Sequence, residues 1–247
     1  MNCTVWTRIE LIKKKNAKNL KMGIIGWAIR LYAKLILMII GWSLIGDEYK
    51  KIKEEARLVI IFPHTSYWDS IMTMIYKISE PTIFRNTYFL MAPRFFNKYT
   101  ETLLTRLGCI PATKKDEKNG GGIERITNML MFKDEFKLAL APKGTIVKSE
   151  WRSGYYWLAK GLKAKICIVG LDYEQKRMVI SKLYQVDCEK DQLELELKKE
   201  AGSIIQINPE NEECCRPYDK NKVGVISRWR IIAIFLIIMI IYRYVKG

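Results

Sequence analysis

The stretch "FPHTSYWDS", residues 62–70, contains the only histidine of the chain, His64, and an aspartate five positions later, Asp69. An aspartate that accepts a hydrogen bond from one ring nitrogen of a histidine fixes its tautomer and supports a developing imidazolium. The other ring nitrogen can then take a proton from a substrate hydroxyl. The spacing allows this if a strand ends before His64 and a helix begins before Asp69. The pair is therefore a candidate catalytic base with its orienting carboxylate.

The same residues also have a purely structural interpretation. Ser66 can be the N-cap of a helix and Asp69, three residues on, its partner in a capping box. Pro63 then ends the strand, and His64 is an incidental loop residue. The two interpretations are compatible, because a carboxylate near a helix start can both cap the helix and orient a histidine.

Short apolar runs rich in β-branched residues alternate with helical patterns along the chain. The runs predict buried strands at 57–62, 87–92, 109–113, 136–141 and 165–171, and an edge strand at 177–181. Helical periodicity is found at 71–78, 99–107, 123–132 and 155–162, and 193–208 is typical of a late helix. This alternation predicts an α/β fold with a largely parallel, mixed sheet flanked by helices.

Polar and basic residues follow four of these predicted strands. His64 follows the first strand, Arg94 the second, Lys114 the third, and "PKGT" at 142–145 the fourth. Ligands of such sheets bind beyond the carboxyl ends of the strands. The sequence therefore predicts a substrate site at this edge of the sheet.

The overall charge limits the kind of partner. The 247 residues carry a formal net charge of +16, which indicates an anionic partner, either nucleic acid or an acidic membrane surface. Zinc-finger spacings, RNA-recognition aromatic motifs and basic zippers, which would favour nucleic acid, do not occur. Two apolar ends favour the membrane.

The N-terminal end combines a basic run, 13–21, with an apolar run, 22–46, that Arg30 and Lys34 interrupt four residues apart. An interfacial helix would use these two residues to reach lipid headgroups, and the alternative is a core helix that covers the sheet. At the other end, the twelve apolar residues 231–242 are too short to cross a core of about 30 Å unaided. We expect a membrane-associating stretch at 1–46, a catalytic domain at 47–222 and an apolar membrane segment at 223–247.

Several blocks, in order, resemble a known family. "PHTSYWD" resembles the HxxxxD signature of the glycerolipid and lysophospholipid acyltransferases, of the 1-acylglycerol-3-phosphate type. "LGCIPATKK", 107–115, is similar to the second family block, and 140–173, which begins "LAPKGT", is similar to the third and fourth. The resemblance extends from about residue 41 to the strand at 177–181.

Two positions depart from the family pattern. Lys143 stands where the family has glutamate, and Ile146 where it has arginine. In the family, basic residues of the second and third blocks are thought to hold the acceptor's phosphate, and Lys114 matches the first of these. Lys143 can supply a replacement cation, and its alternative interpretation is ordinary solvated surface charge.

The resemblance implies acyl transfer from acyl-CoA or an acyl carrier protein to a hydroxyl of a lysophospholipid or glycerolipid-like acceptor. It implies that His64 is the general base and Asp69 its orienting residue, without a metal or a resident cofactor. The substrate-binding candidates are Arg94, Lys114, Lys143, Gly144 and Thr145. We expect a membrane-associated enzyme with its catalytic domain on the cytosolic face. Two alternatives stay open, a catalytically degenerate lipid-binding membrane protein and a basic nucleic-acid-binding protein.

Overall fold

The computed structural model describes residues 24–43, 49–112, 121–146, 150–187 and 189–204. Its sheet has six strands in the order β3-β2-β4-β1-β5-β6. Neighbouring strands are parallel except for β6, which is antiparallel to β5. The predicted α/β fold with a largely parallel, mixed sheet is confirmed, and each predicted strand is present: β1 (Arg57–Ile61), β2 (Thr87–Met91), β3 (Cys109–Pro111), β4 (Phe136–Leu140), β5 (Lys165–Asp172) and β6 (Arg177–Ile180).

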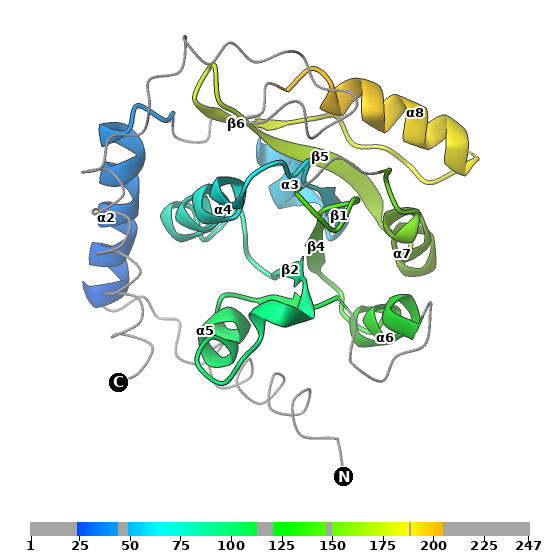
Figure 1. The fold of residues 1–247 in the computed structure, drawn as a ribbon, viewed down its shortest axis with the longest axis horizontal. Helices are drawn as coiled ribbons and strands as arrows, with labels where there is room; N and C mark the ends of the chain where they lie inside the picture. The colour runs from blue at the N-terminus through cyan, green and yellow to red at the C-terminus, as the bar shows by residue number, and fades with distance from the viewer. Residues whose placement is uncertain (1–23, 44–48, 113–120, 147–149, 188, 205–247) are drawn as a thin grey trace.

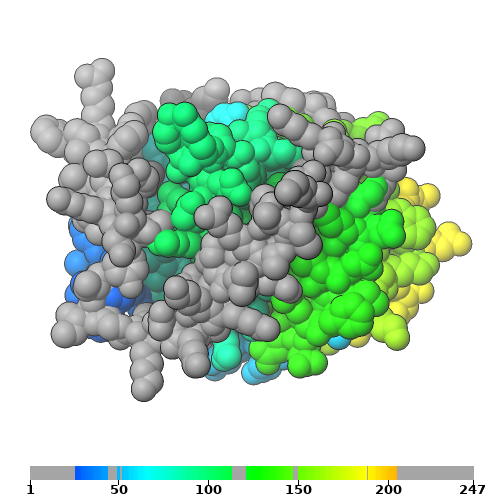
Figure 2. All heavy atoms as spheres, turned by 90° about the horizontal axis from the view of Figure 1, so that it is seen from below, coloured from blue at the N-terminus to red at the C-terminus, as the bar shows by residue number. Residues whose placement is uncertain are grey.

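The predicted helices are present as well, with shifted ends. They are α4 (Tyr67–Ser79), α5 (Glu101–Arg106), α6 (Gly121–Leu130), α7 (Gly154–Leu162) and α8 (Lys190–Ala201). The short helix α3 (Lys50–Glu54) and the 3-10 turn η2 (Pro93–Phe95) were not predicted, because elements this short show no full period of apolar residues. Seen from below, the stretches that contain α5 and α6 form much of the described surface (Figure 2).

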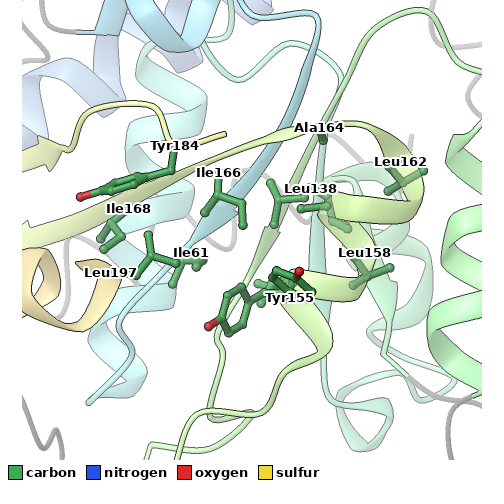
Figure 3. Close-up of a cluster of buried hydrophobic side chains, with 14 of the residues drawn as sticks. Ile61, Leu138, Tyr155, Leu158, Leu162, Ala164, Ile166, Ile168, Tyr184 and Leu197 are labelled. Atoms are coloured by element: carbon green, nitrogen blue, oxygen red, sulfur yellow. The ribbon is translucent and has the colours of Figure 1, made fainter. Parts of the chain in front are cut away.

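Helices cover both faces of the sheet (Figure 1). In β1, Val59 and Ile61 belong to a core shared with α6, α7 and α8, whereas Leu58 and Ile60 belong to a second core shared with α2 (Ile24–Ile39) and α4. Figure 3 shows the first core, where side chains of α7 lie against those of the central strands. Because successive strand residues point to opposite faces, a strand between two cores must be apolar throughout, as predicted.

The N-terminal helix α2 packs on α4 through a buried face that includes Ala33, Ile36 and Leu37. Arg30 and Lys34 bind the carboxylate of Glu80, directly after α4, at 3.2 and 2.5 Å. Both side chains thus reach a protein carboxylate in this structure, and the interpretation that they reach lipid headgroups stays a prediction.

The opposite face of α2 is apolar and exposed. Its exposed side chains are those of Trp27, Leu31, Leu35, Met38 and Ile39. Within the described ranges, no helix has both the length and the hydropathy that crossing a bilayer requires. The basic run 13–21 and the apolar segment 223–247 lie outside the described residues, so their interpretation as membrane segments stays a prediction.

A half-buried lysine ties α4 to the elements beside it. The ammonium of Lys77 donates to the carbonyls of Leu107 and Thr87, at 2.5 and 3.2 Å, and lies 4.5 Å from the centre of the Phe89 ring. Burial lowers the pKa of Lys77 to about 8, and the neighbouring Cys109 opposes this shift. The lysine joins the last turn of α4 to the start of β2 and the end of α5.

We predict that, between about pH 8 and pH 10, the free energy of unfolding of the wild type rises with pH relative to that of Lys77→Met. The unfolded chain keeps this proton up to the ordinary lysine pKa near 10.5, whereas the folded chain releases it near 8. Stability is therefore gained as pH rises through this window and lost as pH falls through it. Urea denaturation of the wild type and of Lys77→Met at several pH values measures the effect.

The comparison between wild type and Lys77→Met is needed because other groups titrate nearby. Burial also lowers the pKa of Lys137, which adds to the slope in both proteins. Burial raises the pKa of Tyr155, and it raises the pKa of Tyr184 to about 12. The unfolded chain therefore releases these two protons more readily than the folded chain, but only above about pH 10, so the two tyrosines lower the free energy of unfolding only there. An equal slope in the wild type and the variant below pH 10 would contradict the assignment to Lys77.

Candidate active site

The site begins at the corner between β1 and α4. Ser66 is the N-cap of α4, and its hydroxyl accepts a hydrogen bond from the backbone N–H of Trp68 at 3.2 Å. The carboxylate of Asp69, at the third helical position, accepts the backbone N–H of Ser66 at 2.9 Å. The predicted capping box is therefore present, and it fixes where the helix begins.

The same carboxylate holds the histidine. Oδ2 of Asp69 lies 3.2 Å from Nδ1 of His64, and it also accepts the backbone N–H of Thr65 at 2.9 Å. With its proton on Nδ1, the neutral ring has an unprotonated Nε2, which can accept a proton. The side chain of His64 keeps 19% of its surface exposed, against 9% for Asp69. The capping box of the structural interpretation is thus present, and the same geometry is compatible with the chemical interpretation, which stays a prediction.

A third side chain joins this pair from a distant part of the chain. The hydroxyl of Tyr173 donates to Oδ1 of Asp69 at 2.7 Å, and Tyr173 is 3% exposed. Tyr173 directly follows β5. The sequence argument considered the ends of the first four strands and missed it, although the same rule applied to the fifth strand would have found it.

The loop after β4 lies beside this corner, because β4 is the parallel neighbour of β1 and Leu140 pairs with Ile61. Gly144 has a φ of +68°, which favours glycine. Its N–H donates to the carbonyl of Ala141 at 3.1 Å. In this conformation that N–H is engaged by the turn, and the role of Gly144 in substrate binding stays a prediction.

The other predicted residues of this loop differ in burial. Lys143 is 1% exposed, so the interpretation as solvated surface charge is wrong. Thr145 is half-buried.

An arginine that the sequence argument missed lies beside the same turn. A guanidinium nitrogen of Arg152 lies 3.9 Å from the position that a Cβ on Gly144 would occupy. The backbone N–H of Arg152 donates to the carbonyl of Pro142 at 3.0 Å, which ties it to the loop after β4. Ile146, which stands at the arginine position of the family, is half-buried. Arg152 thus brings a guanidinium to this loop from six positions further along.

The remaining predicted residues follow β2 and β3. Arg94 lies in η2, exposed, with its guanidinium 5.2 Å from the centre of the Phe95 ring. Lys114 lies outside the described residues. Among the residues that the structure describes, no group of three or more His, Cys, Asp or Glu side chains could hold a metal ion.

The arrangement at the β1–α4 corner is a histidine whose ring is held by a buried carboxylate at the carboxyl edge of a parallel sheet. A family model described as Acyltransferase matches residues 46–205, which include every strand of this sheet. This match covers more than half of the chain, which therefore belongs to that family, the glycerolipid acyltransferases. A comparison with curated proteins found no significant match. Membership supports acyl transfer as the general role of the domain.

Proposed function

We propose that the protein transfers a fatty acyl group from acyl-CoA, or from an acyl carrier protein, to a hydroxyl of a lysophospholipid or glycerolipid-like acceptor, with His64 as the general base. The hydrogen bond between His64 Nδ1 and Asp69 Oδ2, at 3.2 Å within an acyltransferase family domain, carries this proposal. It leaves the second ring nitrogen of a partly exposed histidine for a substrate at the edge of the sheet where ligands of such folds bind.

The proposed reaction needs one proton shuttle. Nε2 of His64 removes the proton of the acceptor hydroxyl as its oxygen attacks the thioester carbonyl, and a C–O bond forms. The tetrahedral intermediate collapses with cleavage of the C–S bond. The imidazolium returns the proton to the departing thiolate, which leaves as the free thiol. Asp69 stabilises the imidazolium between these two steps.

We predict that His64→Ala lowers kcat by about 10²- to 10⁴-fold, because general-base catalysis typically contributes this much. Asp69→Asn should lower kcat less, since the base remains but its orientation is lost. Activity of the wild type should fall as pH is lowered, because a protonated imidazole cannot accept a proton. Product analysis with labelled acyl-CoA and a panel of lysolipids measures the rates and names the acceptor.

A chemical test of the same assignment uses the fact that His64 is the only histidine. A histidine-selective reagent should abolish activity, and bound substrate should protect against it. An active His64→Ala protein with the wild-type pH profile would refute the proposed mechanism and leave His64 as a loop residue beside a helix cap.

The acceptor is proposed to carry a phosphate that Arg152 binds. The family arginine position holds Ile146, but the guanidinium of Arg152 lies beside Gly144 on the same loop, which is adjacent to the end of β1. A planar guanidinium binds phosphate oxygens in a bidentate manner, as the family arginine would. Lys114 is the proposed second cation on the strength of the family pattern.

We predict that Arg152→Gln raises KM for a phosphate-bearing acceptor by about tenfold or more, since a charge-assisted hydrogen bond contributes about 1.5–3 kcal/mol. KM for acyl-CoA should change little. Arg85→Gln is the matched control, because Arg85 is exposed and precedes β2, at the opposite edge of the sheet. Equal effects of Arg152→Gln on acceptors with and without a phosphate would exclude this role.

The protein is further proposed to lie on a membrane, with its catalytic domain on the cytosolic side. The exposed apolar face of α2 and the formal net charge of +16 support this proposal. The carboxylate of Glu80 offsets one of the two positive charges of Arg30 and Lys34 and holds both side chains toward the residue after α4. Acidic lipids attract the basic surface through charge, which salt screens. Inserted apolar side chains contribute a free energy of membrane binding that salt does not screen.

We predict that binding to vesicles of phosphatidylcholine and phosphatidylglycerol persists at about 1 M salt, where the Debye length is about 3 Å. The double variant Met38→Ser and Ile39→Ser should bind at least about tenfold more weakly, because both side chains are exposed and apolar, at 62% and 72%. Leu195→Ser on α8 is the matched control, with Leu195 71% exposed. Unchanged sedimentation of the double variant would show that α2 does not insert.

A further inference from the structure

Both oxygens of the Asp69 carboxylate are engaged, and each faces a different part of the fold. Oδ2 accepts from His64 and from the backbone N–H groups of Thr65 and Ser66, all within five residues of Asp69 in sequence. Oδ1 accepts from Tyr173, which is 104 residues away. The backbone contact from Ser66 is that of a helix cap, whereas the Tyr173 contact comes from the end of another strand and has no capping role.

The contact to Oδ1 fixes the rotation of the carboxylate. The terminal torsion of an aspartate is broad and roughly two-fold, so contacts on one oxygen alone leave the plane of the carboxylate loosely defined. A hydroxyl 2.7 Å from Oδ1 defines that plane, and with it the direction in which Oδ2 meets the imidazole. The donor is buried, so water does not compete for Oδ1 at this point.

The ring of Tyr173 is itself held in place. Trp42, in the segment that directly follows α2, makes an edge-to-face contact with it, with ring centres 5.1 Å apart and an interplanar angle of 87°. The backbone N–H of Trp42 donates to the carbonyl of Leu37 at 2.7 Å, which ties Trp42 to the end of α2. Tyr173 therefore has little freedom to withdraw its hydroxyl from Asp69.

We infer that Tyr173 is a positioning residue for the His64–Asp69 pair, and that Trp42 holds Tyr173 in place from the end of α2. Tyr173 acts through Asp69 and need not touch the substrate. It keeps the imidazole in the tautomer whose Nε2 is unprotonated, the form that the general base requires. The catalytic consequence rests on the proposed function, whereas the effect on the imidazole itself does not.

The alternative is that Tyr173 only satisfies its own buried hydroxyl, as buried tyrosines must. The fold contains a matched example of that case in Tyr76. Tyr76 is also buried and also makes an edge contact with Trp42, at 6.3 Å, but its hydroxyl donates to the backbone carbonyl of Ser43. Removal of either hydroxyl costs buried hydrogen bonding, but only the hydroxyl of Tyr173 reaches the His64–Asp69 pair.

The test compares Tyr173→Phe with Tyr76→Phe, both of which keep the aromatic ring and its packing. Imidazole ¹⁵N NMR reports the tautomer, and the spectrum is unambiguous because the chain has one histidine. We expect one dominant tautomer, protonated on Nδ1, in the wild type and in Tyr76→Phe, and a mixture in Tyr173→Phe. In the transferase assay, Tyr173→Phe should lower kcat about 10- to 100-fold with little change in KM.

Two further measurements test the stability of the Phe variants and the supporting role of Trp42. Urea denaturation should show similar losses for the two Phe variants, so that a difference in tautomer is not a difference in folding. Trp42→Leu, which removes the ring behind Tyr173, should also produce a tautomer mixture. A wild-type tautomer in Trp42→Leu would overturn the supporting role of Trp42.

A wild-type imidazole spectrum in Tyr173→Phe would overturn the inference. A mixed-tautomer spectrum in a protein that transfers no acyl group would instead support the positioning role and refute the proposed function. The two failures are therefore distinguishable, because the NMR measurement requires no substrate.

Discussion

The geometry of the site depends on one buried carboxylate. Asp69 accepts hydrogen bonds from His64, Tyr173 and two backbone N–H groups. A carboxylate removed from water is stable only when such partners replace its hydration. Each partner comes from a different part of the fold: the backbone groups start α4, the histidine follows β1 at the carboxyl edge of the sheet, and the tyrosine follows β5. Loss of this carboxylate would therefore disturb the helix start and the base together.

The sheet explains why these groups meet. β1 lies between β4 and β5, and all three run in parallel, so the segments after them emerge at one edge. The segment after β1 carries His64, the one after β5 begins with Tyr173, and the one after β4 carries Gly144 beside Arg152. Apart from the buried Lys137 of β4 and residues at the strand ends, the central strands are apolar on both faces because two cores enclose them, which keeps this edge in register.

The sequence was sufficient for the architecture and for the local part of the site. Strand runs, helix periods and the His64–Asp69 spacing depend on contacts within a few residues, and such contacts leave a pattern in the sequence. The pairing of Arg30 and Lys34 with Glu80 was beyond that reasoning, as was the burial of Lys143. Both depend on how elements pack, and a charged residue looks the same in sequence whether it is solvated or enclosed. Tyr173 was accessible to the strand-end rule but not its bond to Asp69, because nothing local links residues 104 positions apart.

Helix α2 connects the contacts around Asp69 to an exposed apolar face of the molecule. Arg30 and Lys34 hold it to the residue after α4, and Trp42 at its end packs against both Tyr76 and Tyr173. Its buried face is thus fixed relative to the helix that carries Asp69, while its exposed face is apolar. If that face rests on lipid, as proposed, the orientation of the catalytic pair relative to the membrane is set by rigid packing and not by a linker. An acceptor drawn from the bilayer would then approach His64 from a defined direction, which is what proximity and orientation require of a base that acts on a lipid hydroxyl.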